Sequence, residues 1–429
     1  MANPGRHPMR FDLGLTLVVA LAAAGCGGDG AGTGEWTGTV EDSLGVRIVT
    51  SPAQGVWTEE TRWWVEEEIR IGVEGGNSEL EFGLLGGVDM DDQGRLVALD
   101  VQAARVRIFD ADGELIRAFG RSGSGPGELS NMTMGIFVTG DGEILVPDVA
   151  NGRLARFTVE GEALSAIQLD LTQGFPMAWS RAPDGSVVKQ VRQMDMAGGG
   201  GTPADAMDVL LRLDGTGEVA DTLAVFPAGG TFAADGAGGG PQIRIFAPEP
   251  VWTVLDGPRA VTGLNSEYSL HVRDASGELS TIIRRDFTRR PVTSAHQEAF
   301  RDGLGSAWED AGLPSQAIGQ ILANVEFAEA WPALAALVPG PEGTLWVQRV
   351  EAELDIDPAA LADLQGFQPG GADWDVFDRE GRYLGIVEMP EGFLPTRITE
   401  ERIVGVHRDD LGIQRIMGLR LIRPEPDGS

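Results

Sequence analysis

Short apolar runs separated by turn residues follow one another along most of this chain. Residues 95–99 form an apolar run that is typical of a strand buried on both faces, and residues 105–109 alternate polar with apolar side chains, as a half-exposed strand does. Residues 110–113 carry the Asp and Gly of a hairpin turn, and residues 114–119 follow as an outer strand. Four such strands make one blade of a β-propeller.

This unit recurs at a fixed offset in the sequence. Residues 87–119 match residues 135–167 without a gap, and Gly87 corresponds to Gly135, an offset of 48 residues. Self-similarity at such a period marks a chain built from stacked copies of one unit, since a single copy cannot bury its apolar face. The sequence therefore predicts an all-β repeat fold.

The later copies are looser but can be counted. They restart at residues 183–188, 251–255, 343–347 and 397–406. The last copy stops short of a complete outer strand. Residues 68–72 and 45–49, upstream of the first blade, are two strand candidates that belong to no blade of their own. We expect a six-bladed β-propeller in which the N-terminal strand completes the C-terminal blade, because such pairing removes both exposed sheet edges.

Two segments depart from the strand pattern. Residues 228–241 are rich in glycine and are expected to form a mobile loop. Residues 294–326 are helical in pattern, with Ser294 and Gln297 as a capping box, apolar residues at 300, 304 and 308 on one face, and a second short helix starting at Pro314 and Ser315. We expect this insertion between blades to decorate the surface, with a lid as the alternative.

The N-terminus has the pattern of a targeting segment. Residues 13–24 form an apolar run too short to span a bilayer as a helix, and Cys26, the only cysteine of the chain, follows small residues. We expect Cys26 to carry a lipid; an ordinary secretory signal is the alternative. The expected divisions are a signal peptide at 1–25, a flexible tether at 26–41, the propeller at 42–424 and a tail at 425–429.

Net charge restricts the partners. The chain has 65 acidic residues against 33 Lys and Arg, a formal net charge of −32. Because affinity for nucleic acid comes mostly from cationic neutralisation of phosphates, nucleic acid is not an expected partner.

Acidic residues with metal-ligand spacing occur once. Asp89, Asp91 and Asp100 resemble a calcium loop, but they fall in a strand-turn-strand of the repeat rather than between helices. A hairpin turn is the expected structure, and calcium is kept as an alternative cofactor; no cofactor is otherwise implied. His271, His296 and His407 have no metal-ligand spacing among themselves.

A glycine-rich stretch at residues 120–129 resembles a phosphate cradle. Such a cradle needs a helix after it, and a strand pattern follows here instead, so we expect a connection between blades. Arg121, Asn131 and Trp179 are candidates for contacts with a ligand on an inter-blade face.

The string of blades, with GRSGSGPGEL at residues 120–129, resembles the NHL-repeat and related six-bladed β-propeller lipoproteins of bacteria. Residues 42–49 and 397–412 are also similar to what such chains carry. The resemblance implies a protein anchored by lipid in the bacterial cell envelope. Gly27, rather than Asp, follows Cys26 and predicts sorting to the outer membrane, where the protein would face the periplasm or the cell surface. It carries over no catalytic residue.

Propellers bind ligands at the ends of the central channel, so the expected function is a binding or scaffold module for a protein, peptide or glycan; enzymatic activity is left open. The membrane would be contacted through the lipid only. The alternative is a metal-dependent hydrolase or lactonase of the envelope that uses the central channel.

Overall fold

The described residues form seven sheets, and six of them are the blades of a β-propeller. The computed structural model describes residues 34–73, 79–192, 205–233, 242–350, 370–409 and 411–424. In each blade, four antiparallel strands run from the axis of the ring outward, as the sequence repeat predicts.

Blades 1 to 3 follow one another in sequence. Blade 1 consists of β4 (Leu85–Met90), β5 (Leu96–Asp100), β6 (Arg105–Phe109) and β7 (Leu115–Phe119). Blade 2 consists of β8 (Phe137–Val138), β9 (Ile144–Asp148), β10 (Arg153–Phe157) and β11 (Ile167–Gln168). Blade 3 consists of β12 (Phe175–Arg181), β13 (Val187–Arg192), β14 (Met207–Leu213) and β15 (Val219–Pro227).

Blades 4 and 6 take up strands from the N-terminal part of the chain, and blade 5 lies between them. Blade 4 consists of β18 (Pro250–Leu255), β19 (Arg259–Leu264), β20 (Ser269–Arg273) and β21 (Leu279–Arg285), extended outward by β2 (Val46–Ser51) and β1 (Thr39–Ser43). Blade 5 consists of β23 (Leu334–Pro339), β24 (Leu345–Val350), β25 (Gly370–Phe377) and β26 (Tyr383–Glu388). Blade 6 consists of β27 (Phe393–Ile398), β28 (Arg402–Arg408), β29 (Gln414–Ile422) and β3 (Trp64–Ile71).

The ring is closed by β3, which lies antiparallel to β29 as the outermost strand of blade 6. This confirms the prediction that an N-terminal strand completes the C-terminal blade. Buried side chains from β3, β29 and blade 1 pack in one cluster, which includes Ile69, Ile416 and Phe109. The closing strand is therefore part of the core between the last and the first blade.

Residues 34–71 wrap around the outer edges of three blades. The strand predicted at residues 45–49 is present as β2, which pairs in parallel with β21 of blade 4. The Trp57 backbone N–H then donates to the Leu384 carbonyl of blade 5, at 2.7 Å, before the chain enters β3 of blade 6. We call residues 34–71 the belt.

Apolar packing between blades holds the ring together. Clusters of buried apolar side chains lie between blades 1 and 2, 3 and 4, 4 and 5, 5 and 6, and 6 and 1. Between blades 4 and 5, fully buried Asp375 accepts hydrogen bonds from Tyr268 (2.5 Å), Tyr383 (2.9 Å) and Arg285 (3.2 Å).

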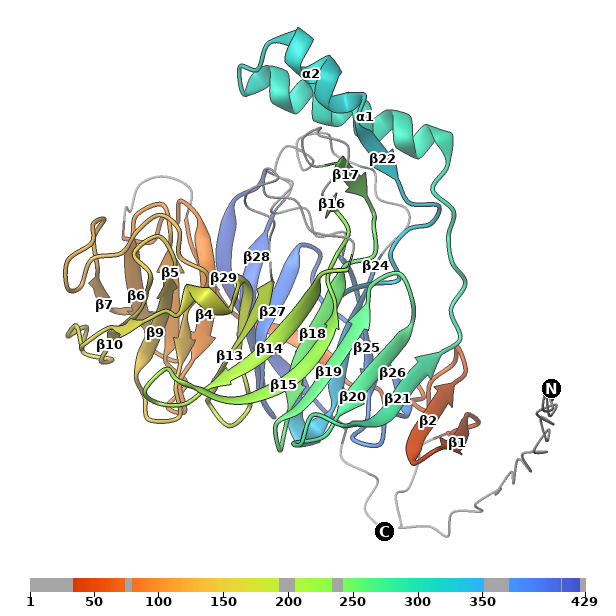
Figure 1. Cartoon of the computed structure of the whole chain (residues 1–429). Helices are drawn as coiled ribbons and strands as arrows, with labels where there is room; N and C mark the ends of the chain where they lie inside the picture. Colours follow the sequence, from red (N-terminus) through yellow and green to blue (C-terminus); the bar gives the residue numbers. More distant parts are fainter. Residues whose placement is uncertain are drawn as a thin grey trace, which may run out of the picture.

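The helical insertion stands over one end of the ring (Figure 1). It contains α1 (Ser294–Asp310) and α2 (Ser315–Leu322), and a small sheet of β16 (Phe232–Ala233), β17 (Gln242–Ile245) and β22 (Val325–Phe327) lies beside it. Phe300 and Leu304 are buried and Trp308 packs against them, as predicted. No described helix is long and apolar enough to cross a membrane.

The predicted capping box is wrong by one residue. The N-cap of α1 is Thr293, whose side chain accepts from the His296 N–H, while the His296 ring accepts from the Thr293 N–H. Ser294 is the first helical residue, and the second helix begins at Ser315 as predicted.

Several other predictions concern residues outside the described ranges. These are residues 1–33 with Cys26 and the first half of the tether, 234–241 of the glycine-rich segment, and 425–429 of the tail. Residues 232–233 of the glycine-rich segment form β16 rather than part of a loop.

Candidate functional site

The two ends of the ring differ in how their strands are connected. At one end, the two inner strands of every blade are joined by a short turn; we call this the turn end. Its turns are residues 91–95, 139–143, 182–186, 256–258, 340–344 and 399–401. The opposite end carries the connections from one blade to the next, and one of these connections contains the two helices. We call this end the insertion end.

Contacts between neighbouring blades support this division. At the turn end, the Thr396 hydroxyl of blade 6 donates to the Val88 carbonyl of blade 1 at 2.6 Å. At the insertion end, the Leu85 N–H of blade 1 donates to the Gln414 side chain of blade 6 at 2.7 Å, and the Val149 N–H donates to the Met132 carbonyl at 3.0 Å.

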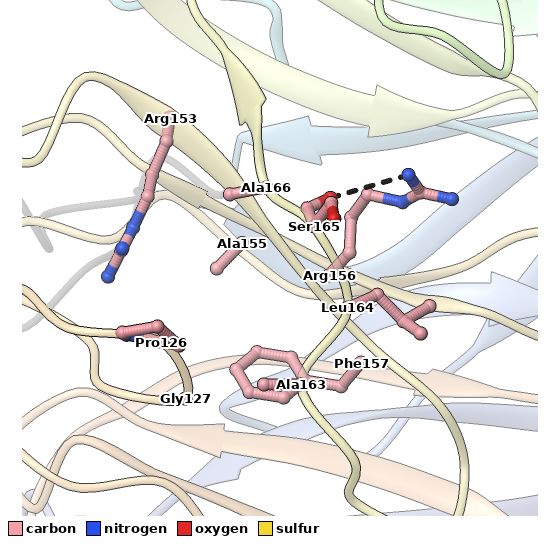
Figure 2. A pocket seen from close by; sticks show the side chains of 10 residues that line it. All are labelled: Pro126, Gly127, Arg153, Ala155, Arg156, Phe157, Ala163, Leu164, Ser165 and Ala166. Carbon is pink, nitrogen blue, oxygen red and sulfur yellow. Dashed lines mark hydrogen bonds between the residues drawn. The ribbon is translucent and has the colours of Figure 1, made fainter.

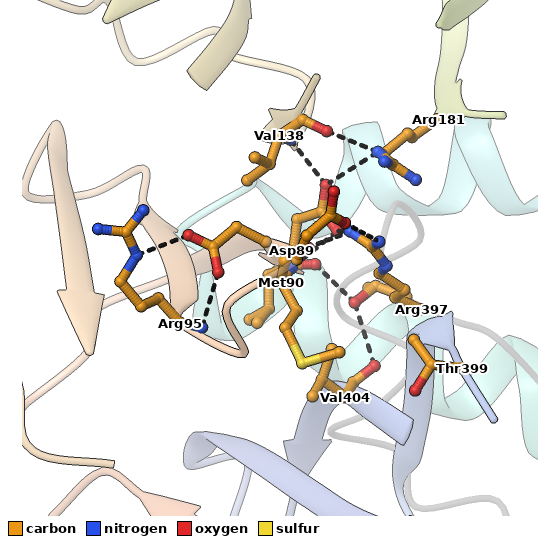
Figure 3. A network of polar contacts seen from close by, with 12 residues as sticks. Asp89, Met90, Arg95, Val138, Arg181, Arg397, Thr399 and Val404 are labelled. Atoms are coloured by element: carbon orange, nitrogen blue, oxygen red, sulfur yellow. Dashed lines mark hydrogen bonds and ion pairs between the residues drawn. The ribbon is translucent and has the colours of Figure 1, made fainter. Parts of the chain in front are cut away.

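A buried charged network bridges the axis near the turn end. Asp89 of blade 1 is 4% exposed and accepts hydrogen bonds from the backbone N–H groups of Met90 (2.8 Å) and Val138 (2.7 Å). Its carboxylate also lies 3.4 Å from the Arg397 guanidinium of blade 6 and 3.9 Å from that of Arg181 of blade 3. Figure 3 shows these groups around Asp89.

Blades 3 and 6 lie opposite each other in a ring of six, so a carboxylate that reaches both arginines spans the axis. Arg181 donates to the Val138 carbonyl at 2.5 Å and Arg397 donates to the Met90 carbonyl. Burial raises the pKa of Asp89, against the effect of both guanidinium groups, and burial lowers the pKa of Arg181. The network therefore links blades 1, 3 and 6 near the turn end.

The three acidic residues with calcium-like spacing have separate partners. Asp91 accepts from the backbone N–H groups of residues 93 and 95 and from the Arg95 side chain, as the first residue of a turn. Asp100 accepts from the buried Arg107 side chain at 3.0 Å, and Asp89 belongs to the axial network. In the described part of the chain, no group of three or more His, Cys, Asp or Glu side chains could hold a metal ion.

Large apolar side chains are exposed at the insertion end. They are Val73, Leu84, Met132, Leu171, Phe175, Met207 and Leu411. These residues lie in, or next to, connections of blades 6, 1, 2 and 3, whereas the helical insertion belongs to the connection between blades 4 and 5.

The three predicted contact residues lie in two places. Arg121 and Asn131 are exposed in the connection between blades 1 and 2, where Arg121 forms an ion pair with Glu128 at 2.7 Å. Trp179 lies half-buried in β12, on the face of blade 3 that carries Lys189. Its indole N–H is buried and finds no acceptor among the described residues.

Residues 120–129 form the predicted connection between blades. Leu129 is fully buried in the cluster between blades 1 and 2, and β8 of blade 2 follows without a helix. Pro126 and Gly127 of this connection line a cavity of about 280 Å³ at the outer edge of blade 2 (Figure 2).

The histidines are dispersed. Burial lowers the pKa of His271 in β20 and of His407 in β28, and His296 caps α1. Arg181 and Arg397 were not predicted from the sequence. Both are charged residues at the end of the first strand of a blade: Arg181 is the last residue of β12, and Arg397 is the last but one of β27. That position is the signal that could have found them.

Comparisons with known proteins agree with this fold. A family model described as a 6-bladed beta-propeller matches residues 76–181. No protein of curated function matches the sequence. A member of the duf4221 family from Bacteroides vulgatus is similar in structure, with 13% identity, 85% of this chain and 99% of that chain covered, and a TM-score of 0.50.

Two further solved structures are similar at lower scores. A putative exported protein from Bacteroides fragilis has 11% identity, covers 88% of this chain and 100% of its own, and gives a TM-score of 0.45. Virginiamycin B lyase from Staphylococcus aureus has 11% identity, with 78% and 94% covered and a TM-score of 0.38. At these identities the likeness concerns the fold alone, and the chain is a six-bladed β-propeller with bacterial structural neighbours.

Proposed function

We propose that this chain is a lipid-anchored binding or scaffold module of the bacterial cell envelope, and that its insertion end is the binding face. The observation that supports this most is the difference between the two ends. The turn end has short turns and a charged network across its axis. The insertion end carries the long connections and seven of the twelve large apolar side chains that are exposed among the described residues. Leu44 and Trp64 are exposed on the side of the turn end.

The chemistry of the insertion end favours a protein or peptide partner over a glycan. Its exposed apolar side chains are aliphatic apart from Phe175, whereas both tyrosines of the chain, Tyr268 and Tyr383, are buried. Burial of aliphatic surface in an interface lowers the free energy, so this surface suits a partner with apolar side chains. The alternative function, a metal-dependent hydrolase or lactonase, stays a prediction that calcium titration can test.

Site-specific crosslinking in cells tests the binding face. A photoreactive phenylalanine at Met132 or Leu171 of the insertion end should give a crosslinked partner. The matched positions Asp141 and Glu342, exposed in turns of the other end, should give none. Crosslinking from the turn end alone, or equally from both ends, would contradict the proposal.

Lipid attachment is tested separately at Cys26. The Cys26→Ser variant should lose fatty-acid labelling and move from the membrane fraction to the soluble fraction. Labelling that persists in this variant would refute the lipid anchor without affecting the binding face.

A further inference from the structure

The hairpin of β1 and β2 ends in a fully exposed leucine. Ser43 pairs with Val46, so the turn between the two strands consists of Leu44 and Gly45 alone. Leu44 is 102% exposed, and a Cβ on Gly45 would meet no atom within 4 Å. All five residues of β1 are exposed as well. The hairpin therefore has a free tip at the outer edge of blade 4 (Figure 1).

Leu44 also has an unfavourable backbone conformation. Its φ is +55° and that of Gly45 is +85°, as in the tight hairpin turns where Asn-Gly and Gly-Gly are preferred. A leucine at positive φ costs free energy, because its Cβ crowds the backbone. Glycine or asparagine would form the same turn at a lower cost, so the turn itself does not explain this leucine.

The other non-glycine residues with positive φ have contacts that offset this cost. In the described ranges they are Ala104, Phe246 and Glu342. Ala104 is buried in the cluster between blades 1 and 2, Phe246 packs among aromatic side chains below α1, and Glu342 forms an ion pair at 2.7 Å. Leu44, whose side chain is wholly in solvent, has no such contact within the described part of the chain. This difference points to a contact outside the chain.

The tip lies at the turn end of the ring. The strand β2 runs parallel to β21, which begins directly after the outer turn of blade 4 at residues 274–278, so Leu44 lies on that side. A second exposed apolar side chain of the belt, Trp64, lies at the same end of blade 6, opposite Ile422. Between these two blades, the Trp57 N–H holds the belt on blade 5. The two exposed side chains therefore flank blade 5 at one end of the ring.

The proposed lipid would bring a membrane to the same place. The N–H of Gly34 donates to the Val56 carbonyl beside blade 5, and the eight residues from Cys26 to Gly34 cover at most about 28 Å. A tether this short raises the local concentration of the belt at the lipid surface. Burial of a leucine in the interface lowers the free energy, and tryptophan favours the headgroup level of a bilayer. Leu44 and Trp64 are thus suited to a lipid surface.

The charges near the tip select the type of lipid. Glu41 and Asp42 are exposed within three residues of Leu44, and Arg47 opposes Asp42 across the hairpin. Two carboxylates against one guanidinium leave the tip acidic, in a chain with a net charge of −32. The negative potential of anionic lipids repels such a tip, whereas zwitterionic headgroups carry no net charge.

We propose that the turn end of blades 4 to 6 docks on a zwitterionic phospholipid surface, into which Leu44 and Trp64 insert. The proposal rests on the lipid anchor proposed above. It adds a direct contact of the protein, whereas the sequence analysis expected contact with the membrane through the lipid only. Docking through the turn end leaves the insertion end accessible to a partner.

Spin labelling of the lipidated full-length chain in phosphatidylcholine vesicles tests the proposal. Because Cys26 is the only cysteine and is acylated, Ser43→Cys beside the tip and Asp112→Cys in the outer turn of blade 1 each supply one free thiol for a nitroxide. Electron paramagnetic resonance measures collisions of the nitroxide with oxygen, which concentrates in lipid, and with a neutral nickel chelate, which stays in water. The oxygen-to-nickel ratio should be several-fold higher at residue 43 than at residue 112.

The outcomes distinguish docking from anchoring. Equal ratios at the two positions, in protein that floats with the vesicles, would overturn the docking and leave the lipid anchor intact. Protein that does not float with the vesicles would refute the anchor and the docking that depends on it.

Variants at the tip separate docking from the turn. Asparagine tolerates positive φ, so Leu44→Asn should raise the thermal midpoint, while the ratio at residue 43 should fall several-fold. Ile116→Asn, which replaces a 51% exposed aliphatic residue in the outer strand of blade 1, is the matched control and should leave that ratio unchanged. Adding phosphatidylglycerol to the vesicles should lower the ratio. A ratio that persists in Leu44→Asn, or that rises with the anionic lipid, would overturn the proposal.

Discussion

The closing strand β3 offers a direct test of how the ring is held together. Ile69 of β3 is 6% exposed and packs among buried side chains of blades 6 and 1, including Met90 and Phe109. Replacing a buried isoleucine with alanine typically costs about 2–5 kcal/mol, because transfer free energy is lost and a cavity remains. We expect Ile69→Ala to lower the free energy of unfolding by this amount.

Ile116→Ala is the matched control, since it is the same chemical change in another outer strand. Ile116 lies in β7 of blade 1 and is 51% exposed, so its loss should change stability by less than about 0.5 kcal/mol. Urea denaturation followed by tryptophan fluorescence measures both variants. Trp57 and Trp63 of the belt, with ring centroids 5.1 Å apart, report on the closing segment directly.

Similar midpoints and slopes for the two variants would refute the reasoning. In that case β3 would be a strand that detaches before the ring unfolds, and ring closure would contribute nothing to the cooperative unit. A lower midpoint for Ile69→Ala with an unchanged slope would place β3 inside that unit.

Three further predictions concern charged and titratable side chains. Asp375→Asn should destabilise the protein by about 3–5 kcal/mol in urea denaturation, because Arg285 keeps a buried charge without its carboxylate. Asp221→Asn, whose pair with Arg212 is partly exposed, should cost less than about 1 kcal/mol. Burial lowers the pKa of His407 in the folded state below its ordinary 6.5, so the unfolded state binds the proton more readily. The contribution of His407 should therefore lower the free energy of unfolding as the pH drops below about 6.5 and should add no slope above that pH. The variant His407→Gln should reduce the slope below pH 6.5. Calcium titration by calorimetry should show no saturable micromolar site, and a site abolished by Asp91→Asn would instead favour the metal-dependent alternative.

Local patterns were sufficient to predict the blades. The repeat from Gly87 to Gly135 reflects equivalent turns and strands, and blades 1 and 2 each form from strands that are neighbours in the sequence. In the turn at 110–114, Asp110 accepts from the N–H groups of residues 112 and 114, and Gly113 adopts a φ of +90° that favours glycine. In such turns the Asp side chains of the repeat, such as Asp91 and Asp110, accept backbone hydrogen bonds and stabilise the turn.

Contacts between distant residues could not be predicted in the same way. Arg397 reaches Asp89 only because the ring closes, and β2 joins blade 4 through a parallel pairing with β21. The helix cap also escaped prediction, since a histidine, His296, takes the position where the usual pattern has Glu or Gln. The cavity of blade 2 depends on a strand that ends early, which composition does not show.

The path of the belt relates the proposed anchor to the proposed contact surfaces. The N–H of Gly34 donates to the Val56 carbonyl at 3.0 Å, next to the residues that contact blade 5. The eight residues from Cys26 to Gly34 cover at most about 28 Å. A lipid on Cys26 would therefore hold the outer edge of blades 4 and 5 near the membrane. Blades 1 and 2, which lie opposite in the ring and carry Met132, would then face away from the membrane, where a partner protein can reach them.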